Sequence, residues 1–231
     1  PGGMVGFEVD GEKVGAYLAR PAGGGAPPGV VVIHEWWGLN DQIKGVADRF
    51  ASIGYLALVP DLYRGKVPAD AGLAHELMRG LNENRAVGII KGAAAHLRSI
   101  DGAKDRRVAT VGFCMGGRLS LAAALRGADV QATVIFYGGV ETTREAIAPI
   151  KAPVLGIFGA ADRGIPVEDV KKFEAALKAA GKEATILIYP ELGHAFFNEQ
   201  RPSYDETMAM DAWHRTKNFL GKHLAPQPGG A

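Results

Sequence analysis

The sequence predicts a three-layer α/β fold built on a mostly parallel β-sheet, and three observations lead to this class. Short runs such as Val30–Ile33 and Tyr55–Val59 are apolar throughout, so as strands they need cover on both faces. Longer helical patterns separate these runs, as expected when helices connect parallel strands. The chain has 231 residues, 47% of them hydrophobic and 22% charged, which suits one large domain spanning residues 1–231.

The expected elements follow in order along the chain. Gly6–Asp10 and Lys13–Arg20 form an N-terminal β-hairpin, and Pro21–Gly29 is a Gly- and Pro-rich loop. The sheet is expected to contain the buried strands Val30–Ile33, Tyr55–Val59, Arg107–Phe113, Ala132–Tyr137, Val154–Phe158 and Thr185–Tyr189. The expected helices are Asp41–Ile53, Arg85–Ile100, Met115–Arg126, Val167–Ala180 and Tyr204–His223. The stretch between Val59 and Arg85 is expected to be irregular, and the tail Ala225–Ala231 to be frayed.

Charge and composition exclude several classes of partner. Lys and Arg number 26 against 25 Asp and Glu, a net charge of +1 with no basic stripe, so no nucleic-acid partner is expected. No apolar stretch reaches the ~18–20 residues that span a bilayer, so no membrane partner is expected. The start Pro1–Met4 has no signal-peptide pattern, and we expect a cytoplasmic protein.

The single cysteine, Cys114, excludes an internal disulfide and a cysteine metal cluster. His34 and Glu35 have no third metal ligand at a recognisable spacing, so we expect no metal and no cofactor.

Cys114 lies in the segment Gly112-Phe113-Cys114-Met115-Gly116-Gly117, between an expected strand and an expected helix. This segment matches the nucleophile-elbow pattern G-x-[S/C]-x-G, in which flanking glycines avoid clashes with the neighbouring strand and helix. A helix N-terminus also favours a thiolate. A lone cysteine is often a buried small apolar residue, but the elbow context favours a reactive nucleophile.

A polar residue follows each of two further expected strands. Asp162 follows the strand Val154–Phe158, and His194 follows Thr185–Tyr189. By itself Asp162 suggests a turn residue and His194 a surface residue. However, the order nucleophile, acid, base is that of α/β-hydrolases, so we predict a triad of Cys114, Asp162 and His194.

The loop after Val30–Ile33 reads His34-Glu35-Trp36-Trp37-Gly38. In this fold class it supplies one oxyanion-hole N–H, for which Trp36 is the candidate, and Met115 after the nucleophile supplies the other. Glu35 at the end of a buried strand needs a partner. A structural salt bridge to an arginine is one possibility, and a contact with the Cys114 thiol is the functional one.

The segments GFCMGG, HEWWGLN, PDLYRG and GHAFFN resemble the dienelactone hydrolase family, over about residues 6–223. The resemblance implies an α/β-hydrolase fold and a cysteine-dependent hydrolase of lactones or small carboxylic esters, acting through an acyl-Cys intermediate. It implies that Cys114, Asp162 and His194 are catalytic, and that Glu35 holds the resting thiol and turns away when substrate binds. It also implies that Trp37 and Tyr137 line the pocket.

One position departs from the family pattern. Dienelactone hydrolases bind the substrate carboxylate with two arginines, one of them four residues after the triad histidine, where this chain has Asn198. An asparagine lacks the charge of a guanidinium, so with Asn198 in the substrate site we expect neutral esters to be hydrolysed at least as well as acidic ones. His75 and Arg79 give no clear match for the second arginine, and Arg64 and Arg118 are expected to be surface or structural residues.

Two alternatives remain open from the sequence. The same site could support acyl transfer or another thiol activity, because fold and triad do not fix the acceptor. The other alternative is a non-catalytic member of the fold that binds a ligand. The intact set of site residues argues against this alternative.

Overall fold

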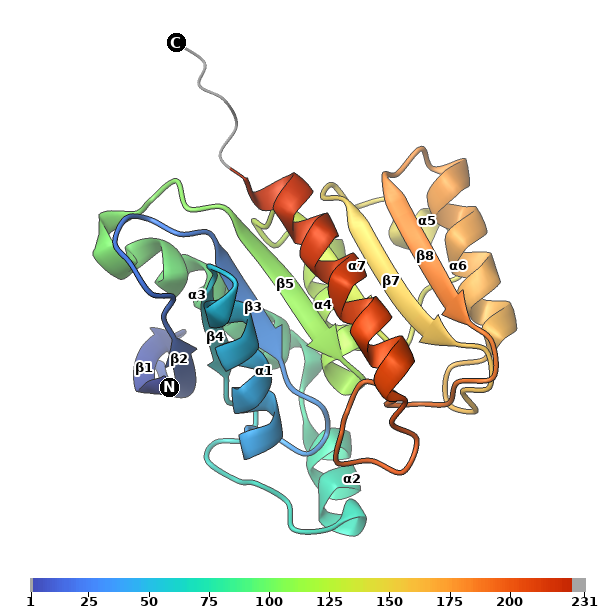
Figure 1. The fold of residues 1–231 in the computed structure, drawn as a ribbon, viewed down its shortest axis with the longest axis horizontal. Coiled ribbons are helices and arrows are strands. Elements are labelled where there is room, and N and C mark those ends of the chain that lie inside the picture. Colours follow the sequence, from blue (N-terminus) through green and yellow to red (C-terminus); the bar gives the residue numbers. More distant parts are fainter. Residues whose placement is uncertain (1, 226–231) are drawn as a thin grey trace.

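The computed structural model describes residues 2–225, which form an eight-stranded sheet between two layers of helices (Figure 1). The strands are β1 (Gly3–Val9), β2 (Glu12–Ala19), β3 (Gly29–Ile33), β4 (Leu56–Pro60), β5 (Val108–Phe113), β6 (Ala132–Phe136), β7 (Val154–Gly159) and β8 (Ala184–Tyr189). Their order in the sheet is β1-β2-β4-β3-β5-β6-β7-β8. Neighbours from β4 to β8 pair in parallel, whereas β2 pairs antiparallel with both β1 and β4. The predicted three-layer α/β fold with a mostly parallel sheet is therefore confirmed.

The predicted N-terminal hairpin is present, with a turn at Asp10 and Gly11. Both residues have positive φ angles, 49° and 80°, as a tight two-residue hairpin turn of the mirror-image type requires. Register pairs Val9 with Glu12 next to the turn and Gly3 with Leu18 at the far end. The first strand therefore begins at Gly3, three residues before the predicted start.

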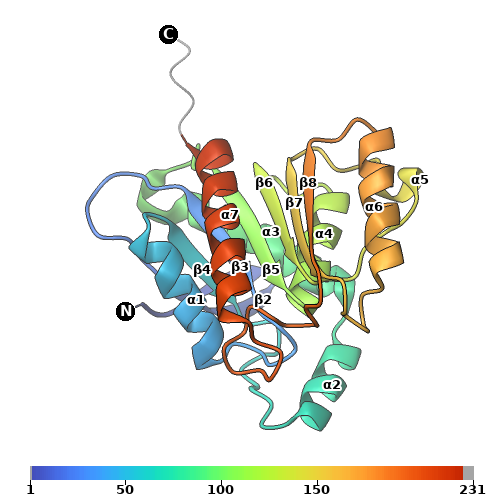
Figure 2. The same ribbon diagram turned by 45° about the vertical axis from the view of Figure 1, so that its right-hand side comes forward.

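The helices cover the two faces of the sheet unequally (Figures 1 and 2). The helices are α1 (Asp41–Ser52), α2 (Ala71–Gly80), α3 (Glu83–Ser99), α4 (Met115–Leu125), α5 (Arg144–Ile147), α6 (Val167–Ala179) and α7 (Glu206–Leu224). Residues of α1 and α7 share one apolar core with the sheet, and those of α3 to α6 form the cores on the other face. Strand residues alternate between the two sides: Val30 and Val32 belong to the first core, whereas Val31 and Ile33 belong to the opposite one.

The expectation of an irregular stretch between Val59 and Arg85 is wrong in part, because this stretch contains α2 and the first two residues of α3. Asp70 caps α2 by accepting a hydrogen bond from the Leu73 N–H, and Asn82 caps α3 by accepting from the Arg85 N–H. In α2 only Ala74 is buried, so its sequence lacks the broad apolar face by which helices are recognised. The short helix α5, which Thr143 caps, was also not predicted.

The carboxyl ends of the parallel strands lie at one edge of the sheet, beside which α2 stands (Figure 1). Ligand sites in such sheets are found at this edge. Of the predicted frayed tail, Ala225 is described and residues 226–231 lie outside the described residues. Within residues 2–225, no helix combines the length and the apolar character needed to cross a bilayer.

Candidate active site

Cys114 lies at a strained turn between β5 and α4. Its φ is +58° and its ψ is −118°, a conformation that a non-glycine residue rarely adopts. A Cβ at Gly112 would lie 1.9 Å from the carbonyl oxygen of Gly116, and one at Gly116 would lie 2.2 Å from that of Ile33. Only glycine fits at these two positions, so the sequence pattern around Cys114 forms the geometry of a nucleophile elbow.

Cys114, His194 and Asp162 form a continuous chain of hydrogen bonds. Nε2 of His194 lies 3.0 Å from Sγ of Cys114, and its Nδ1 lies 2.7 Å from Oδ2 of Asp162. The other carboxylate oxygen of Asp162 accepts hydrogen bonds from the N–H groups of Gly164 and Ile165. Since an ionised carboxylate only accepts, Nδ1 of His194 carries a proton and Nε2 faces the sulfur. The three residues predicted from strand ends, here those of β5, β7 and β8, thus lie in one hydrogen-bonded chain. Their catalytic roles stay predictions.

The environment of His194 favours its charged form. Burial alone lowers the pKa of His194, but the hydrogen bonds to Asp162 and Cys114, and the negative charges there, raise it from 6.5 to about 10. An imidazolium at His194 stabilises a negative charge on the neighbouring sulfur. In this arrangement the buried Asp162 orients a histidine that favours its charged form beside the Cys114 sulfur.

Glu35 contacts different partners from those expected. Its carboxylate accepts a hydrogen bond of 2.5 Å from Nδ2 of Asn198 and one of 3.2 Å from the Tyr137 hydroxyl. Within residues 2–225, no hydrogen bond joins Glu35 to Cys114, whose thiol faces His194. The expected contact between Glu35 and the resting thiol is thus wrong for this structure. Burial raises the pKa of Glu35, against the opposing effect of these two hydrogen bonds and of the positive charges on His194 and Arg201.

His34 fixes the backbone before the two tryptophans. It is fully buried, and its Nε2 accepts a hydrogen bond from the Leu62 N–H at 3.1 Å. Nδ1 therefore carries the proton and donates it to the carbonyl oxygen of Glu35, 2.6 Å away. Burial lowers the pKa of His34, which keeps the ring neutral as this pattern requires. His34 thus positions Glu35 and Trp36, a role that the sequence analysis did not assign.

The two candidate oxyanion-hole donors come from separate elements. Trp36 follows β3, and Met115 is the first residue of α4, where backbone N–H groups lack partners within the helix. Both residues line the same cavity as Cys114. This placement is compatible with the predicted pair of donors.

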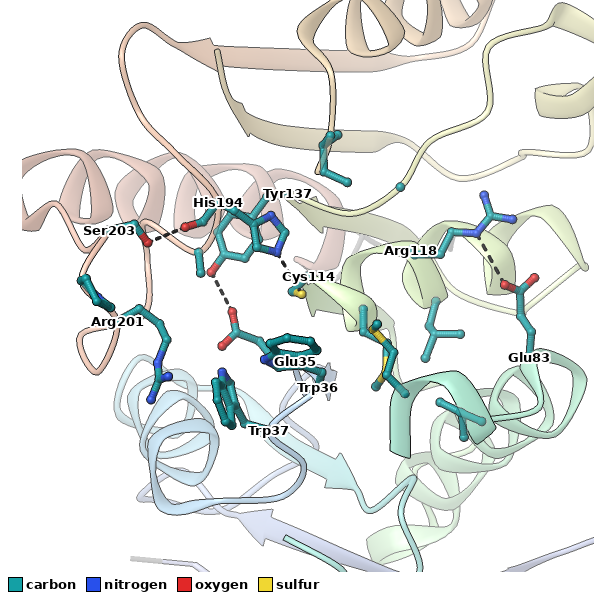
Figure 3. Close-up of a pocket in the computed structure, with 18 residues that line it drawn as sticks. Glu35, Trp36, Trp37, Glu83, Cys114, Arg118, Tyr137, His194, Arg201 and Ser203 are labelled. Carbon is teal, nitrogen blue, oxygen red and sulfur yellow. Dashed lines mark hydrogen bonds and ion pairs between the residues drawn. The ribbon is translucent and has the colours of Figure 1, made fainter. Parts of the chain in front are cut away.

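The cavity that contains Cys114 has a volume of about 600 Å³. Figure 3 shows Trp36, Trp37 and Glu35 on one side of the cysteine and Tyr137 with His194 on the other. Further apolar lining residues come from α2 and the residue after it, from α4, and from the loop between β7 and α6: Met78, Leu81, Leu119 and Ile165. The predicted pocket residues Trp37 and Tyr137 therefore lie at the cavity. Asn198 is 2% exposed and is not among the residues that line it.

Two arginines line the cavity at opposite sides of Cys114 (Figure 3). Arg118 is paired, with Nη1 2.8 Å from Glu141 and Nε 3.5 Å from Glu83. Arg201 stacks on Trp37, with Cζ 4.2 Å from the ring centroid, and makes no ion pair within the described residues. Among residues 2–225, its buried Nε has no hydrogen-bond partner. Arg201 was not predicted as a site residue, although an arginine seven residues after the predicted base is a sequence signal that points to it.

The remaining residues without an assigned role lie outside the cavity lining. Arg64 forms a surface ion pair with Glu12 at 2.9 Å, as expected for a structural residue. His75 lies edge-on to Trp36 at a centroid distance of 6.3 Å, and Arg79 is exposed on α2. Within residues 2–225, no three His, Cys, Asp or Glu side chains are grouped so that they could hold a metal ion.

The sheet order, the elbow and the hydrogen-bonded Cys–His–Asp set together define an α/β-hydrolase. The sequence profile of the dienelactone hydrolase family matches residues 14–224, so the chain belongs to this family and is a hydrolase that acts on ester bonds.

Individual relatives align with nearly the whole chain. The chain is 37% identical to the "Protein usf" of Aquifex pyrophilus, with 96% of this chain and 99% of that protein covered. It is 34% identical to a "Putative carboxymethylenebutenolidase" of Methylorubrum extorquens, covering 96% and 81% respectively. A crystal structure titled "Putative Dienelactone Hydrolase", from Klebsiella pneumoniae, superposes with a TM-score of 0.87 at 31% identity, covering 98% of this chain and 99% of that one.

Proposed function

We propose that the protein hydrolyses lactones or small carboxylic esters through an acyl-Cys114 intermediate. The observation that carries this proposal is the hydrogen-bond chain from Sγ of Cys114 through His194 to the buried Asp162, at the wall of a cavity. The strained backbone at Cys114 presents the sulfur at the start of α4, where the helix N-terminus favours negative charge.

In the first half-reaction, the thiolate of Cys114 attacks the carbonyl carbon of the ester. The carbonyl oxygen becomes an oxyanion, which the N–H groups of Trp36 and Met115 are proposed to bind. When the tetrahedral intermediate collapses, the C–O bond breaks and the leaving alkoxide takes the proton from Nε2 of His194. In a lactone the released hydroxyl stays attached to the acyl group.

In the second half-reaction, a water molecule attacks the thioester carbonyl while Nε2 of His194 takes one of its protons. Collapse of this second intermediate breaks the C–S bond, releases the carboxylic acid and restores the thiolate–imidazolium pair. Asp162 keeps the proton on Nδ1 and stabilises the charged ring throughout.

A chromogenic acetyl ester tests this mechanism. After a rapid acid quench during turnover, intact-mass spectrometry should detect one added acetyl group, and peptide mapping should locate it at Cys114. Cys114→Ala should lack the adduct and lose ~10⁴–10⁶ in kcat with unchanged far-UV circular dichroism. Retained turnover in folded Cys114→Ala would contradict the cysteine mechanism.

The residues that line the cavity also indicate a narrower class of ester or lactone substrates. Most of the lining side chains are apolar, but Arg201 brings a cation that forms no ion pair among the described residues, although its charge acts on Glu35. We therefore propose that the preferred substrate carries an anionic group beside its ester or lactone, at a distance that lets it reach Arg201 while Cys114 attacks.

A further inference from the structure

Asn198 is held so firmly that its side chain cannot serve the substrate directly. It is 2% exposed, and its own N–H donates to the Ala195 carbonyl oxygen at 3.0 Å. Its side-chain Oδ1 accepts a hydrogen bond from the Gln200 N–H at 2.9 Å. Because Oδ1 faces this backbone donor, the orientation of the amide is determined and Nδ2 is directed at Glu35.

Glu35 depends on this amide. It is 4% exposed, and a buried carboxylate is costly unless hydrogen bonds satisfy it. One oxygen accepts from Asn198 at 2.5 Å and the other from the Tyr137 hydroxyl at 3.2 Å. Of these two hydrogen bonds, the one from Asn198 is the shorter. Hydrogen bonds to an ionised carboxylate are stronger than those between neutral groups.

Glu35 also shares its cavity with Cys114, whose thiol is another donor available to a carboxylate. In the structure that thiol faces His194 instead, at 3.0 Å. The structure has Glu35 bound to Asn198 and the sulfur next to His194. In the competing arrangement, Glu35 would bind the thiol and so take the sulfur away from its base.

We propose that Asn198 is a positioning residue that holds the Glu35 carboxylate against Tyr137 and away from Cys114, so that the Cys114–His194 pair is assembled before substrate binds. Asn198 acts through Glu35 and touches neither the sulfur nor the substrate. The catalytic consequence rests on the proposed function, whereas the arrangement of the resting thiol does not.

Asn198→Asp is the sharpest test, because it keeps the shape and the oxygen that accepts from Gln200 but replaces the donor to Glu35 by a second carboxylate. The measurement is the second-order rate of Cys114 alkylation by iodoacetamide against pH, without substrate. We expect the profile to move to higher pH, with alkylation at pH 7 about tenfold slower than in the wild type. Asn198→Ala, which removes the donor without adding charge, should slow alkylation in the same direction.

The double variant Glu35→Gln/Asn198→Asp shows whether the effect passes through Glu35. Here the amide and the carboxylate exchange places, so a donor and an acceptor face each other again. Its alkylation profile should match that of Glu35→Gln alone. Asn218→Asp, the same change at an exposed residue of α7, should leave the wild-type profile unaltered.

Two results would overturn the proposal. One is a wild-type alkylation profile in folded Asn198→Asp and Asn198→Ala. The other is a slowing that persists undiminished when Glu35 is replaced by Gln, because Asn198 would then act by another route. Alkylation requires no turnover, so failure of the acyl-Cys mechanism would appear separately, as ester hydrolysis that survives in Cys114→Ala.

Discussion

Nε2 of His194 lies 3.0 Å from Sγ of Cys114, although 80 positions separate the two residues in the chain. The strands that precede them, β8 and β5, are separated by β6 and β7, which corresponds to about 14 Å across the sheet. The loop after β8 spans this gap by crossing the end of β7, where the Ala161 N–H donates to the Leu192 carbonyl oxygen at 2.9 Å. A Cβ at Gly159 would lie 2.2 Å from that same oxygen, so this crossing requires a glycine.

The orientation of Asp162 leads to a prediction about the His194 tautomer. In Asp162→Asn, the amide oxygen should take the position that accepts from Gly164 and Ile165, which turns the NH₂ group toward Nδ1 of His194. Nδ1 must then accept, so Nε2 carries the proton and can no longer take one from Cys114. We expect kcat for a chromogenic ester to fall by ~10³–10⁴ with the fold retained.

Asp205 provides the matched control. It caps α7 by accepting from the Met208 N–H at 2.9 Å, and Asn caps helices about as well as Asp. Asp205→Asn should therefore keep the wild-type kcat. Equal loss of activity in the two variants would argue against a specific effect on the tautomer.

Glu35→Gln should make the protein more stable at high pH. Burial raises the pKa of Glu35 above its usual 4.5, so the folded state binds this proton more tightly than the unfolded chain. The wild type therefore loses stability as the pH rises from about 4.5 through the folded pKa. Gln does not titrate and avoids this loss.

Thermal melting of both proteins between pH 4.5 and pH 8 measures the effect of Glu35→Gln. The variant's Tm should exceed the wild-type Tm at pH 8, and the difference should shrink toward pH 4.5. A wild type that melts above the variant at pH 8 would show that the bonds from Asn198 and Tyr137 outweigh the cost of burial.

The sequence was sufficient for those features that local chemistry determines. The glycines around Cys114 predicted the elbow, because a Cβ at Gly112 or Gly116 would overlap backbone oxygens. Uniformly apolar runs predicted a parallel sheet covered on both faces. The strand order of that sheet brings Cys114, Asp162 and His194 together at one edge.

The features that the sequence did not predict depend on long-range contacts. One partner of Glu35 is Asn198, 163 positions away, and nothing local to either residue distinguishes this contact from one with the Cys114 thiol. Likewise, Arg201 reaches the cavity because its guanidinium stacks on Trp37 from a different loop. Helix α2 was missed because only one of its ten residues is buried, so its pattern lacks a broad apolar face.

Two glycine-to-alanine substitutions should have opposite effects on stability. At Gly45, within α1, a Cβ would meet nothing within 4 Å, so Gly45→Ala should stabilise the protein by ~0.5–1 kcal/mol. At Gly116, a Cβ would lie 2.2 Å from the carbonyl oxygen of Ile33 and 2.6 Å from that of His34. Gly116→Ala should destabilise by roughly 3 kcal/mol and lower activity, because relief of the overlap moves the loop that carries Glu35 and Trp36.

Urea unfolding of the two alanine variants and the wild type measures this contrast. The midpoint should rise for Gly45→Ala and fall for Gly116→Ala, with similar m values. A Gly116→Ala protein with the stability and turnover of the wild type would mean that the elbow is not packed against β3 as the structure has it.

The charge of the preferred substrate should depend on Arg201, and Arg118 supplies the matched control. Arg118 also lines the cavity, but Glu141 and Glu83 neutralise it at 2.8 and 3.5 Å. Arg118→Gln should therefore leave the preference between acidic and neutral substrates unaltered. Arg201→Lys keeps the charge but loses the planar guanidinium that stacks on Trp37, so it should give an intermediate preference.

Arg201→Gln should remove the preference for acidic substrates. The sequence, with Asn198 in the substrate site, predicts that neutral esters react at least as well as acidic ones. In the structure, however, Asn198 is buried against Glu35, and Arg201 lines the cavity. We therefore expect kcat/KM for an acidic lactone to exceed that for its neutral methyl ester in the wild type. A hydrogen bond to a charged group contributes ~1.5–3 kcal/mol, so Arg201→Gln should lower this ratio roughly 10- to 150-fold. A wild-type ratio at or below one, unchanged in Arg201→Gln, would show that the guanidinium interacts with Trp37 and Glu35 but does not bind the substrate.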